Sequence, residues 1–307
     1  MRLCSGLMAK GMAAGLVVTG LAGFTQVSGA TTARAATVAR SVPATGLRSA
    51  TGSGPTGIKA TYAEVASAQT GASFWSRSPD TEVPMGSITK VMTAYVVLKA
   101  GHLNRLITVP GGITAYDKKY GASTAGLKPG ERLTARQLLY AMLVPSGCDA
   151  AYTLATAYGP GRGRFIARMN AAAARLGLSS THFTDFSGLP DPTERSTYSD
   201  ARDLIALGRD AMALPLFASI VRTAKYHLPH AWGEHPAFTW KTSNPLIGSY
   251  DGAVGIKTGD TRVAGDCLLF EAVRDGDAVI GVVLHDRSWK AVTSDSEALL
   301  DYGFSQS

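Results

Sequence analysis

Ser87 and Lys90 precede an apolar run and have the spacing of a serine nucleophile and its base. If the run 91–98 continues a helix, residues three apart lie on one face, so the amine lies beside the hydroxyl. A serine hydroxyl is a weak nucleophile until a base within hydrogen-bond distance takes its proton. A lysine amine is such a base when it is neutral, and burial and a second nearby cation favour that form. The pattern therefore predicts an activated serine at a helix N-terminus, whose free N–H groups attract developing negative charge.

The same spacing has a plainer interpretation, in which the serine caps a helix and the lysine lies on its surface. Two further motifs argue against it. Ser146-Gly147-Cys148 follows Pro145 between two helical runs, on an irregular connection of the kind that often carries functional residues. Lys257-Thr258-Gly259 lies in a strand-like run near the end of the chain. Together the three motifs indicate one acyl-transfer site rather than a chance spacing.

Each motif supplies a different part of that chemistry. Ser87 attacks a carbonyl carbon, Lys90 accepts its proton, and Ser146 relays a proton to the leaving amine. General-base assistance of this kind is worth about 10²–10⁴ in rate. Lys257 supplies the second cation, which favours the neutral form of the first amine and attracts an anionic substrate.

Two neighbours of Lys257 complete the predicted binding strand. Thr258 offers a hydroxyl to a substrate carboxylate. Gly259 has no side chain, so the sequence predicts that a substrate backbone approaches the strand edge at this position.

On these motifs, and on the stretches between them, the chain resembles the exported serine D-alanyl-D-alanine carboxypeptidases, which are low-molecular-mass penicillin-binding proteins of the β-lactamase/transpeptidase-like fold. The resemblance implies hydrolysis of the terminal D-Ala-D-Ala bond of peptidoglycan stem peptides through an acyl-Ser87 intermediate, and slow acylation by β-lactams. It also implies an oxyanion hole formed by the backbone N–H groups of Ser87 and Asp260. The resemblance extends from about residue 59 to 304, through segments 85–95, 143–147, 176–183, 187–189, 242–246, 255–261, 264–265 and 300–304.

Two residues depart from the family's pattern. The second motif usually ends in asparagine, and Cys148 stands there. An amide both donates and accepts hydrogen bonds, whereas a thiol does neither well, so we expect weaker orientation of the substrate by Cys148. Asp260 places a carboxylate beside the predicted oxyanion hole, where it would oppose the developing charge if it turned inward. We expect it to point to solvent.

These departures keep other functions open. A catalytically impaired module that binds penicillin and wall peptides without turnover is the main alternative. A DD-endopeptidase acting on cross-links uses the same residues, and the sequence does not separate it from a carboxypeptidase. A β-lactamase ranks lower, because the glutamate motif that serves deacylation is not evident.

The order of elements predicts an α/β (α+β) fold. The domain begins with strand-like residues that form a predicted hairpin over 58–76. It ends with three strand-like runs over 254–285 and a closing helix at 294–304. Helical patterns fill the middle of the chain. We therefore expect an antiparallel sheet built from both ends of the chain, flanked by helices, with a helical insertion.

Within this outline the sequence predicts a catalytic domain over 58–307 with a helical subdomain at about 100–215. The insertion includes a helix that opens with a capping box, Thr134 with Gln137. Residues 111–125 are predicted to be a polar, glycine-rich loop. Residues 219–240 are predicted to be extended segments around a polar loop.

The N-terminus is typical of an export signal. Arg2 and Lys10 precede a short apolar stretch at 12–24 that glycines interrupt, which favours a cleaved signal peptide over 1–35 rather than a membrane anchor. Residues 36–57 are rich in alanine, threonine, serine, glycine and proline and form a predicted flexible linker. We therefore expect an exported, monomeric protein, extracellular or associated with the cell wall, without a stable membrane anchor.

Charge and composition exclude some partners. The formal charge of +7 falls to about +4 without the three basic residues of the signal, and no cluster of Lys and Arg is interleaved with aromatic residues. Nucleic acid is therefore not an expected partner. A weak attraction to anionic polymers such as a cell wall is compatible with this charge.

Cysteines and histidines leave one question open. Cys148 and Cys267 remain after the signal, and in an exported chain they either pair or stay free. His227, His230 and His235 lie close together, but without helical spacing or a neighbouring cysteine. We expect neither a metal site nor a cofactor.

Overall fold

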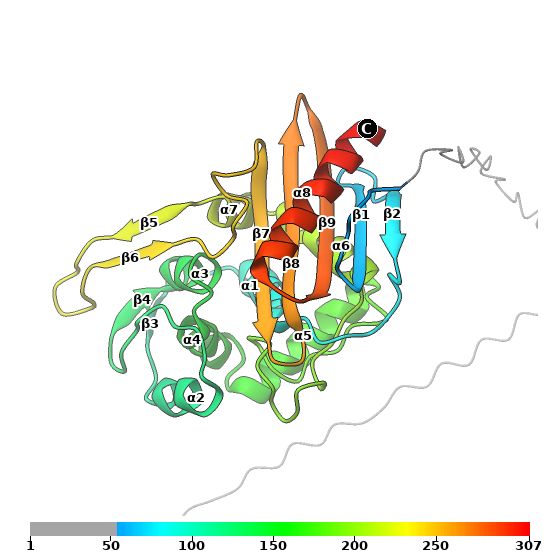
Figure 1. Cartoon of the computed structure of the whole chain (residues 1–307). Helices are drawn as coiled ribbons and strands as arrows, with labels where there is room; N and C mark the ends of the chain where they lie inside the picture. Colours follow the sequence, from blue (N-terminus) through cyan, green and yellow to red (C-terminus); the bar gives the residue numbers. More distant parts are fainter. Residues whose placement is uncertain (1–53) are drawn as a thin grey trace, which may run out of the picture. The chain divides into compact units, whose positions relative to one another are not determined.

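A five-stranded antiparallel sheet in the order β2-β1-β9-β8-β7 lies at the centre of the described domain (Figure 1). The computed structural model describes residues 54–307, which belong to one compact unit. The predicted signal peptide and most of the predicted linker lie outside the described residues. The boundary of the helical subdomain remains a prediction.

The strands of the sheet come from both ends of the described chain, which confirms the predicted architecture. The pairing of β1 with β9 joins the two groups, since Ala63 lies opposite Val283 in an antiparallel register. The hairpin turn between β8 and β9 lies at Asp275–Gly276. The strands are β1 (Tyr62–Ser67), β2 (Ser73–Arg77), β7 (Ala253–Thr261), β8 (Gly265–Arg274) and β9 (Asp277–Asp286).

Both faces of the sheet are covered by helices. Side chains of β9 alternate between them: Ile280 and Val282 pack into the larger core, with the helices of the insertion, whereas Val279 and Val283 pack into a second core beneath α8 (Trp289–Gln306). Because both faces are buried, these strands are continuous apolar runs in the sequence.

The insertion between β2 and β7 is mainly helical. Its central helix is α1, which is buried over most of its first eight residues and is capped by Gly101. Two small two-stranded sheets accompany the helices, β3 (Leu106–Thr108) with β4 (Arg132–Thr134) and β5 (Lys225–Leu228) with β6 (Phe238–Lys241). The helices are α1 (Lys90–Ala100), α2 (Gly112–Tyr120), α3 (Ala135–Leu143), α4 (Cys148–Tyr158), α5 (Arg162–Leu176), α6 (Ala201–Met212) and α7 (Pro215–Val221).

Local capping signals place these helices well. The predicted capping box is present at the start of α3, where Thr134 accepts from the Gln137 N–H and Gln137 accepts from the Thr134 N–H. Asp200 caps α6 by accepting from the Asp203 N–H. Such caps satisfy backbone groups that would otherwise be unpaired at the helix ends.

The prediction of a loop over 111–125 is wrong in part, because residues 112–120 form α2. Ile113 and Tyr116, three residues apart, are buried against the core and hold this helix in place. Gly121 ends it with a positive φ. The extended prediction from residue 219 is also wrong at its start, since α7 continues to Val221.

In the described part of the chain, no single helix combines the length and apolar character needed to cross a membrane. The pair α6 and α7 meets those criteria jointly, with a bend of 108° between the helices. Among residues 54–307, no group of three or more His, Cys, Asp or Glu side chains is placed to hold a metal ion.

Candidate active site

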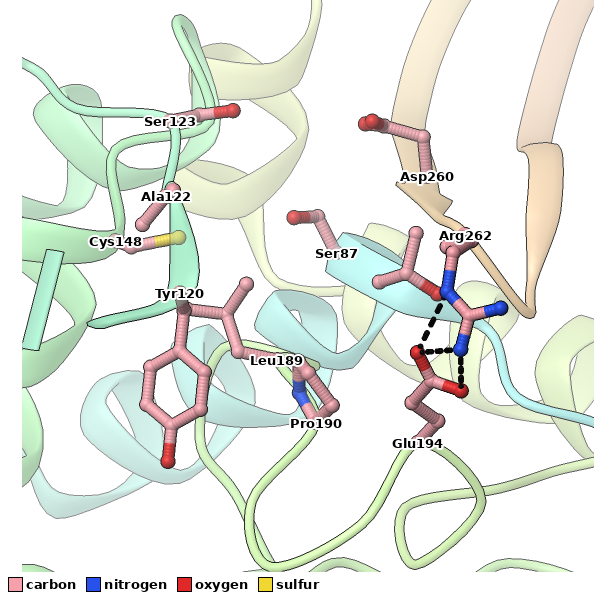
Figure 2. Close-up of a pocket in the computed structure, with 12 residues that line it drawn as sticks. Ser87, Tyr120, Ala122, Ser123, Cys148, Leu189, Pro190, Glu194, Asp260 and Arg262 are labelled. Atoms are coloured by element: carbon pink, nitrogen blue, oxygen red, sulfur yellow. Dashed lines mark hydrogen bonds and ion pairs between the residues drawn. The ribbon is translucent and has the colours of Figure 1, made fainter. Parts of the chain in front are cut away.

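Ser87 lies in a short 3₁₀ turn, Gly86–Thr89, directly before α1. It is largely buried, with 8% of its surface exposed, yet it lines a cavity of about 260 Å³. Figure 2 shows its side chain facing this cavity, with Cys148 on one side and Asp260 on the other. The nucleophile predicted from the sequence is therefore accessible from a cleft while most of its surroundings are dry.

Lys90 begins α1, and its amine is completely buried. Its Nζ lies 2.6 Å from Ser87 Oγ and donates to the Ser187 carbonyl at 3.2 Å. A neutral amine with one N–H directed to that carbonyl can direct its lone pair to the serine hydroxyl. The predicted contact between these two side chains is therefore present, and its geometry suits a base.

A second serine–lysine pair joins the insertion to the sheet. Lys257 Nζ, on β7, donates to Ser146 Oγ at 2.9 Å, and Lys257 is 1% exposed. Ser146 lies between α3 and α4 with a φ of +66°, a conformation uncommon for residues other than glycine. Backbone in this region often marks a functional position.

The electrostatics of the site couple the two lysines. Burial lowers the pKa of Lys257 well below its usual value, and the positive charge of Lys90 lowers it further. Weaker contributions from Cys148 and Asp260 act in the opposite direction. Two buried amines therefore disfavour simultaneous protonation, which is the property that a proton relay between them requires.

Thr258 forms part of a second cavity of about 330 Å³, which Ser146 also lines. Its hydroxyl accepts from Lys257 Nζ at 3.1 Å and lies 2.8 Å from Ser243 Oγ. Ser123 and Asp260 line both cavities, so the two adjoin. A hydroxyl held beside a lysine amine in this way is a suitable site for a carboxylate.

Gly259 is required for a second reason, which was not predicted from the sequence. A Cβ at this position would lie 2.3 Å from the Met85 carbonyl oxygen and 3.1 Å from the Ser87 nitrogen, so the glycine is needed for β7 to pack against the Ser87 turn. Gly86, on the Ser87 turn, is needed for the same packing, because a Cβ added there would lie 2.7 Å from the Asp260 nitrogen. The predicted oxyanion donors, the backbone nitrogens of Ser87 and Asp260, therefore both lie where β7 packs closely against the Ser87 turn.

Cys148 and Cys267 are both free thiols, so the alternative of a disulfide between them is wrong. Cys148 is 1% exposed and lines the cavity beside Ser87. Burial raises its pKa, and the nearby Lys90 charge only partly opposes this. The group that replaces the family's asparagine is therefore a neutral thiol. Asp260 is exposed, as expected from the sequence.

A buried carboxylate behind Lys90 was not predicted from the sequence. Asp185 accepts from the Tyr116 hydroxyl at 2.7 Å, from the Ser187 hydroxyl at 2.7 Å, and from the N–H groups of residues 187–189. This network fixes the turn whose Ser187 carbonyl holds Lys90. Residues 187–189 are among the segments that carry the family resemblance. No local pattern in the sequence indicated that Ser187 contacts Lys90, which is 97 residues away in the chain.

An ion pair at the surface forms part of the cleft wall, and it too was not predicted. Arg262, after β7, contacts both carboxylate oxygens of Glu194 at 2.6 Å (Figure 2). Both residues line the Ser87 cavity. Arg262 is 81% exposed, and pairs this exposed contribute little to stability.

Comparisons with known proteins agree with this geometry. Residues 49–288 match the model of the family described as D-alanyl-D-alanine carboxypeptidase. The chain is 39% identical over 246 residues to the D-alanyl-D-alanine carboxypeptidase of Streptomyces sp. (strain K15), covering 76% of this chain and 84% of that protein. It is 35% identical over 243 residues to D-alanyl-D-alanine carboxypeptidase DacB2 of Mycobacterium tuberculosis (strain ATCC 25618 / H37Rv), covering 78% and 80%.

Solved structures show the same likeness. The crystal structure of the Streptomyces K15 DD-transpeptidase matches with a TM-score of 0.78 at 38% identity, over 83% of this chain and all of that one. The fold predicted from the order of strands and helices is thus confirmed by a close structural relative as well as by the sheet itself.

Proposed function

Because this chain belongs to the D-alanyl-D-alanine carboxypeptidase family, we propose that it hydrolyses the terminal D-Ala-D-Ala bond of peptidoglycan stem peptides. The observation that carries the proposal is the pair of buried serine–lysine contacts at adjoining cavities, Ser87 with Lys90 and Ser146 with Lys257. The reaction passes through an acyl-Ser87 ester and needs neither a metal nor a cofactor.

Acylation begins at the first pair. Lys90 takes the proton of Ser87 Oγ as the oxygen attacks the carbonyl carbon of the penultimate residue. The negative charge that develops on the carbonyl oxygen is stabilised by the backbone N–H groups of Ser87 and Asp260. Each such donor is worth about 10²–10³ in rate.

The second pair serves the leaving group. Ser146 gives its hydroxyl proton to the departing amine nitrogen and regains, through Lys257, the proton that Lys90 took from Ser87, which frees Lys90 to act as a base again. Thr258, beside the Lys257 amine, binds the terminal carboxylate of the substrate. Water then attacks the ester carbonyl as Lys90 takes its proton, and Lys90 passes this proton to Ser87 Oγ as the ester bond breaks.

Release of D-alanine from a diacetyl-L-Lys-D-Ala-D-Ala peptide tests the proposal, with fluorescent penicillin as a second readout. The wild type should release D-alanine and become labelled, and Ser87→Ala should lose both activities by at least about 10³-fold. Cys148→Asn should be labelled faster, because the amide orients the substrate better than the thiol. A wild type that is labelled but releases no D-alanine would favour the impaired, peptide-binding module instead.

A second outcome for the same acyl-enzyme is transfer to an amine instead of water. The Streptomyces K15 structure that this chain resembles is named a DD-transpeptidase, and this name is the reason to test for transfer. The two outcomes separate when a primary amine is added to the assay. Transfer joins the acyl group to the added amine and lowers the yield of the shortened peptide, whereas hydrolysis gives only the shortened peptide.

The substrate implies a location. We propose that the protein is exported and acts outside the cytoplasmic membrane, in the cell wall. The support is the signal-like sequence before residue 36 and the presence of stem peptides in the wall. Fractionation of cells that produce the full chain, with N-terminal sequencing of the product, tests both export and cleavage.

A further inference from the structure

We infer that Asp260 selects substrates by the charge of the leaving group: it disfavours leaving groups that end in a free carboxylate and favours neutral or positively charged ones. The inference rests on the proposed function, since it concerns the same cleft. It concerns the Asp260 side chain, whereas the proposed oxyanion contact uses only the backbone of that residue.

The position of Asp260 is the first argument. Its side chain is exposed and lines both the Ser87 cavity and the Ser146 cavity. Figure 2 shows it on the cleft wall across from Ser123. A group that leaves the Ser87 ester, or one that arrives to attack it, passes this carboxylate.

Strand geometry places the carboxylate near the proposed anion site. Thr258 and Asp260 are two residues apart on β7, so their side chains lie on the same face, with Cα atoms about 7 Å apart. The negative charge of Asp260 also acts on Lys257, where it opposes the fall in pKa caused by burial and by Lys90. The carboxylate is thus within electrostatic reach of the amine and hydroxyl that would hold a terminal carboxylate.

No described cation neutralises Asp260. Within residues 54–307 it takes part in no ion pair, and the nearby Arg262 is engaged by both oxygens of Glu194. Directly across the sheet on β8 lies a second acid, Asp266. Two unit charges about 7 Å apart near a protein surface, screened by physiological salt, change binding by roughly three- to tenfold.

The experiment compares three peptides that differ only in the charge of the leaving group. Their acyl part is diacetyl-L-Lys-D-Ala, and the leaving groups are D-alanine, D-alaninamide and D-alanine 2-aminoethylamide, which are anionic, neutral and cationic. The measured quantity is the ratio of kcat/KM between peptides, for wild type and for Asp260→Asn. Asp266→Asn is the matched control, because it removes the same charge from the neighbouring strand without lining either cavity.

Asp260→Asn should raise the anionic-to-neutral ratio by about three- to tenfold and lower the cationic-to-neutral ratio by a similar factor. Asp266→Asn should move neither ratio by more than about twofold. In the wild type, added salt should raise the anionic-to-neutral ratio, because it screens the Asp260 charge. Ratios in Asp260→Asn equal to those of the wild type, or equal shifts in both variants, overturn the inference.

The proposed function and this inference fail differently. If the wild type cleaves none of the three peptides, the proposed hydrolysis is wrong. The inference is then decided by acylation of Ser87 with benzylpenicillin and with its methyl ester, whose carboxylate is neutralised. The acid-to-ester ratio of acylation rates should rise in Asp260→Asn, and an unchanged ratio overturns the inference without reference to hydrolysis.

Discussion

The two serine–lysine pairs of the site have similar geometry and different origins. Ser87 and Lys90 are three residues apart in the chain, at the junction of a 3₁₀ turn and α1. Ser146 and Lys257 are 111 residues apart and meet only where the insertion packs against β7. The first contact is fixed by local helical geometry. The second depends on the register of the sheet, on the close approach at Gly259 and on the strained backbone of Ser146.

The comparison indicates that the two pairs serve different steps of the reaction. The local pair holds the nucleophile and its base, which must be aligned in every step of the reaction. The distant pair holds the leaving-group side of the cleft, so the packing of sheet against insertion controls that side. Variants in the two pairs should therefore differ in size of effect and in the step that they affect.

The largest effect is expected from the local pair. Lys90→Met should lower the rate of Ser87 acylation by about 10²–10⁴, because it removes the base while keeping a side chain of similar length. Penicillin labelling against time measures this rate. Lys99→Met, an exposed position on the same helix, is the matched control and should label at the wild-type rate. Rapid labelling of Lys90→Met would show that another group takes the serine proton.

A smaller effect is expected from the distant pair. Ser146→Gly should slow peptide cleavage by about 10²-fold, because proton transfer to the leaving amine loses its relay. Glycine adopts the φ of +66° without strain, so this variant separates the loss of the hydroxyl from backbone strain. Thermal unfolding should show little change. A loss as large as that of Lys90→Met would mean that the two pairs do not divide the work as proposed.

The third prediction concerns stability and pH. The pKa of Lys257 is lowered in the folded protein, so the unfolded chain binds the proton more strongly and stability rises with pH up to the ordinary lysine value of about 10.5. Lys257→Met removes this dependence. The variant should therefore gain more in Tm, relative to wild type, at pH 6 than at pH 9. An equal difference at the two pH values would contradict a lowered pKa for Lys257.

Much of the fold follows from patterns near each residue. The capping box at Thr134 and the strands at both ends of the domain lie where the sequence predicts. The helix α2 was missed because glycines at both ends and a polar composition favour a loop. Burial of Ile113 and Tyr116 in the core outweighs that local preference, and only packing reveals it.

The sequence by itself determined the identity of the reactive groups and the one contact that spacing can fix, Ser87 with Lys90. Tertiary structure decided that Lys257 bonds Ser146, that the two cysteines stay unpaired, and that Asp260 remains exposed at the cleft. The physical reason is the length of chain between the partners. Helical geometry sets distances over three or four residues, whereas contacts between residues a hundred apart are set by strand register and core packing.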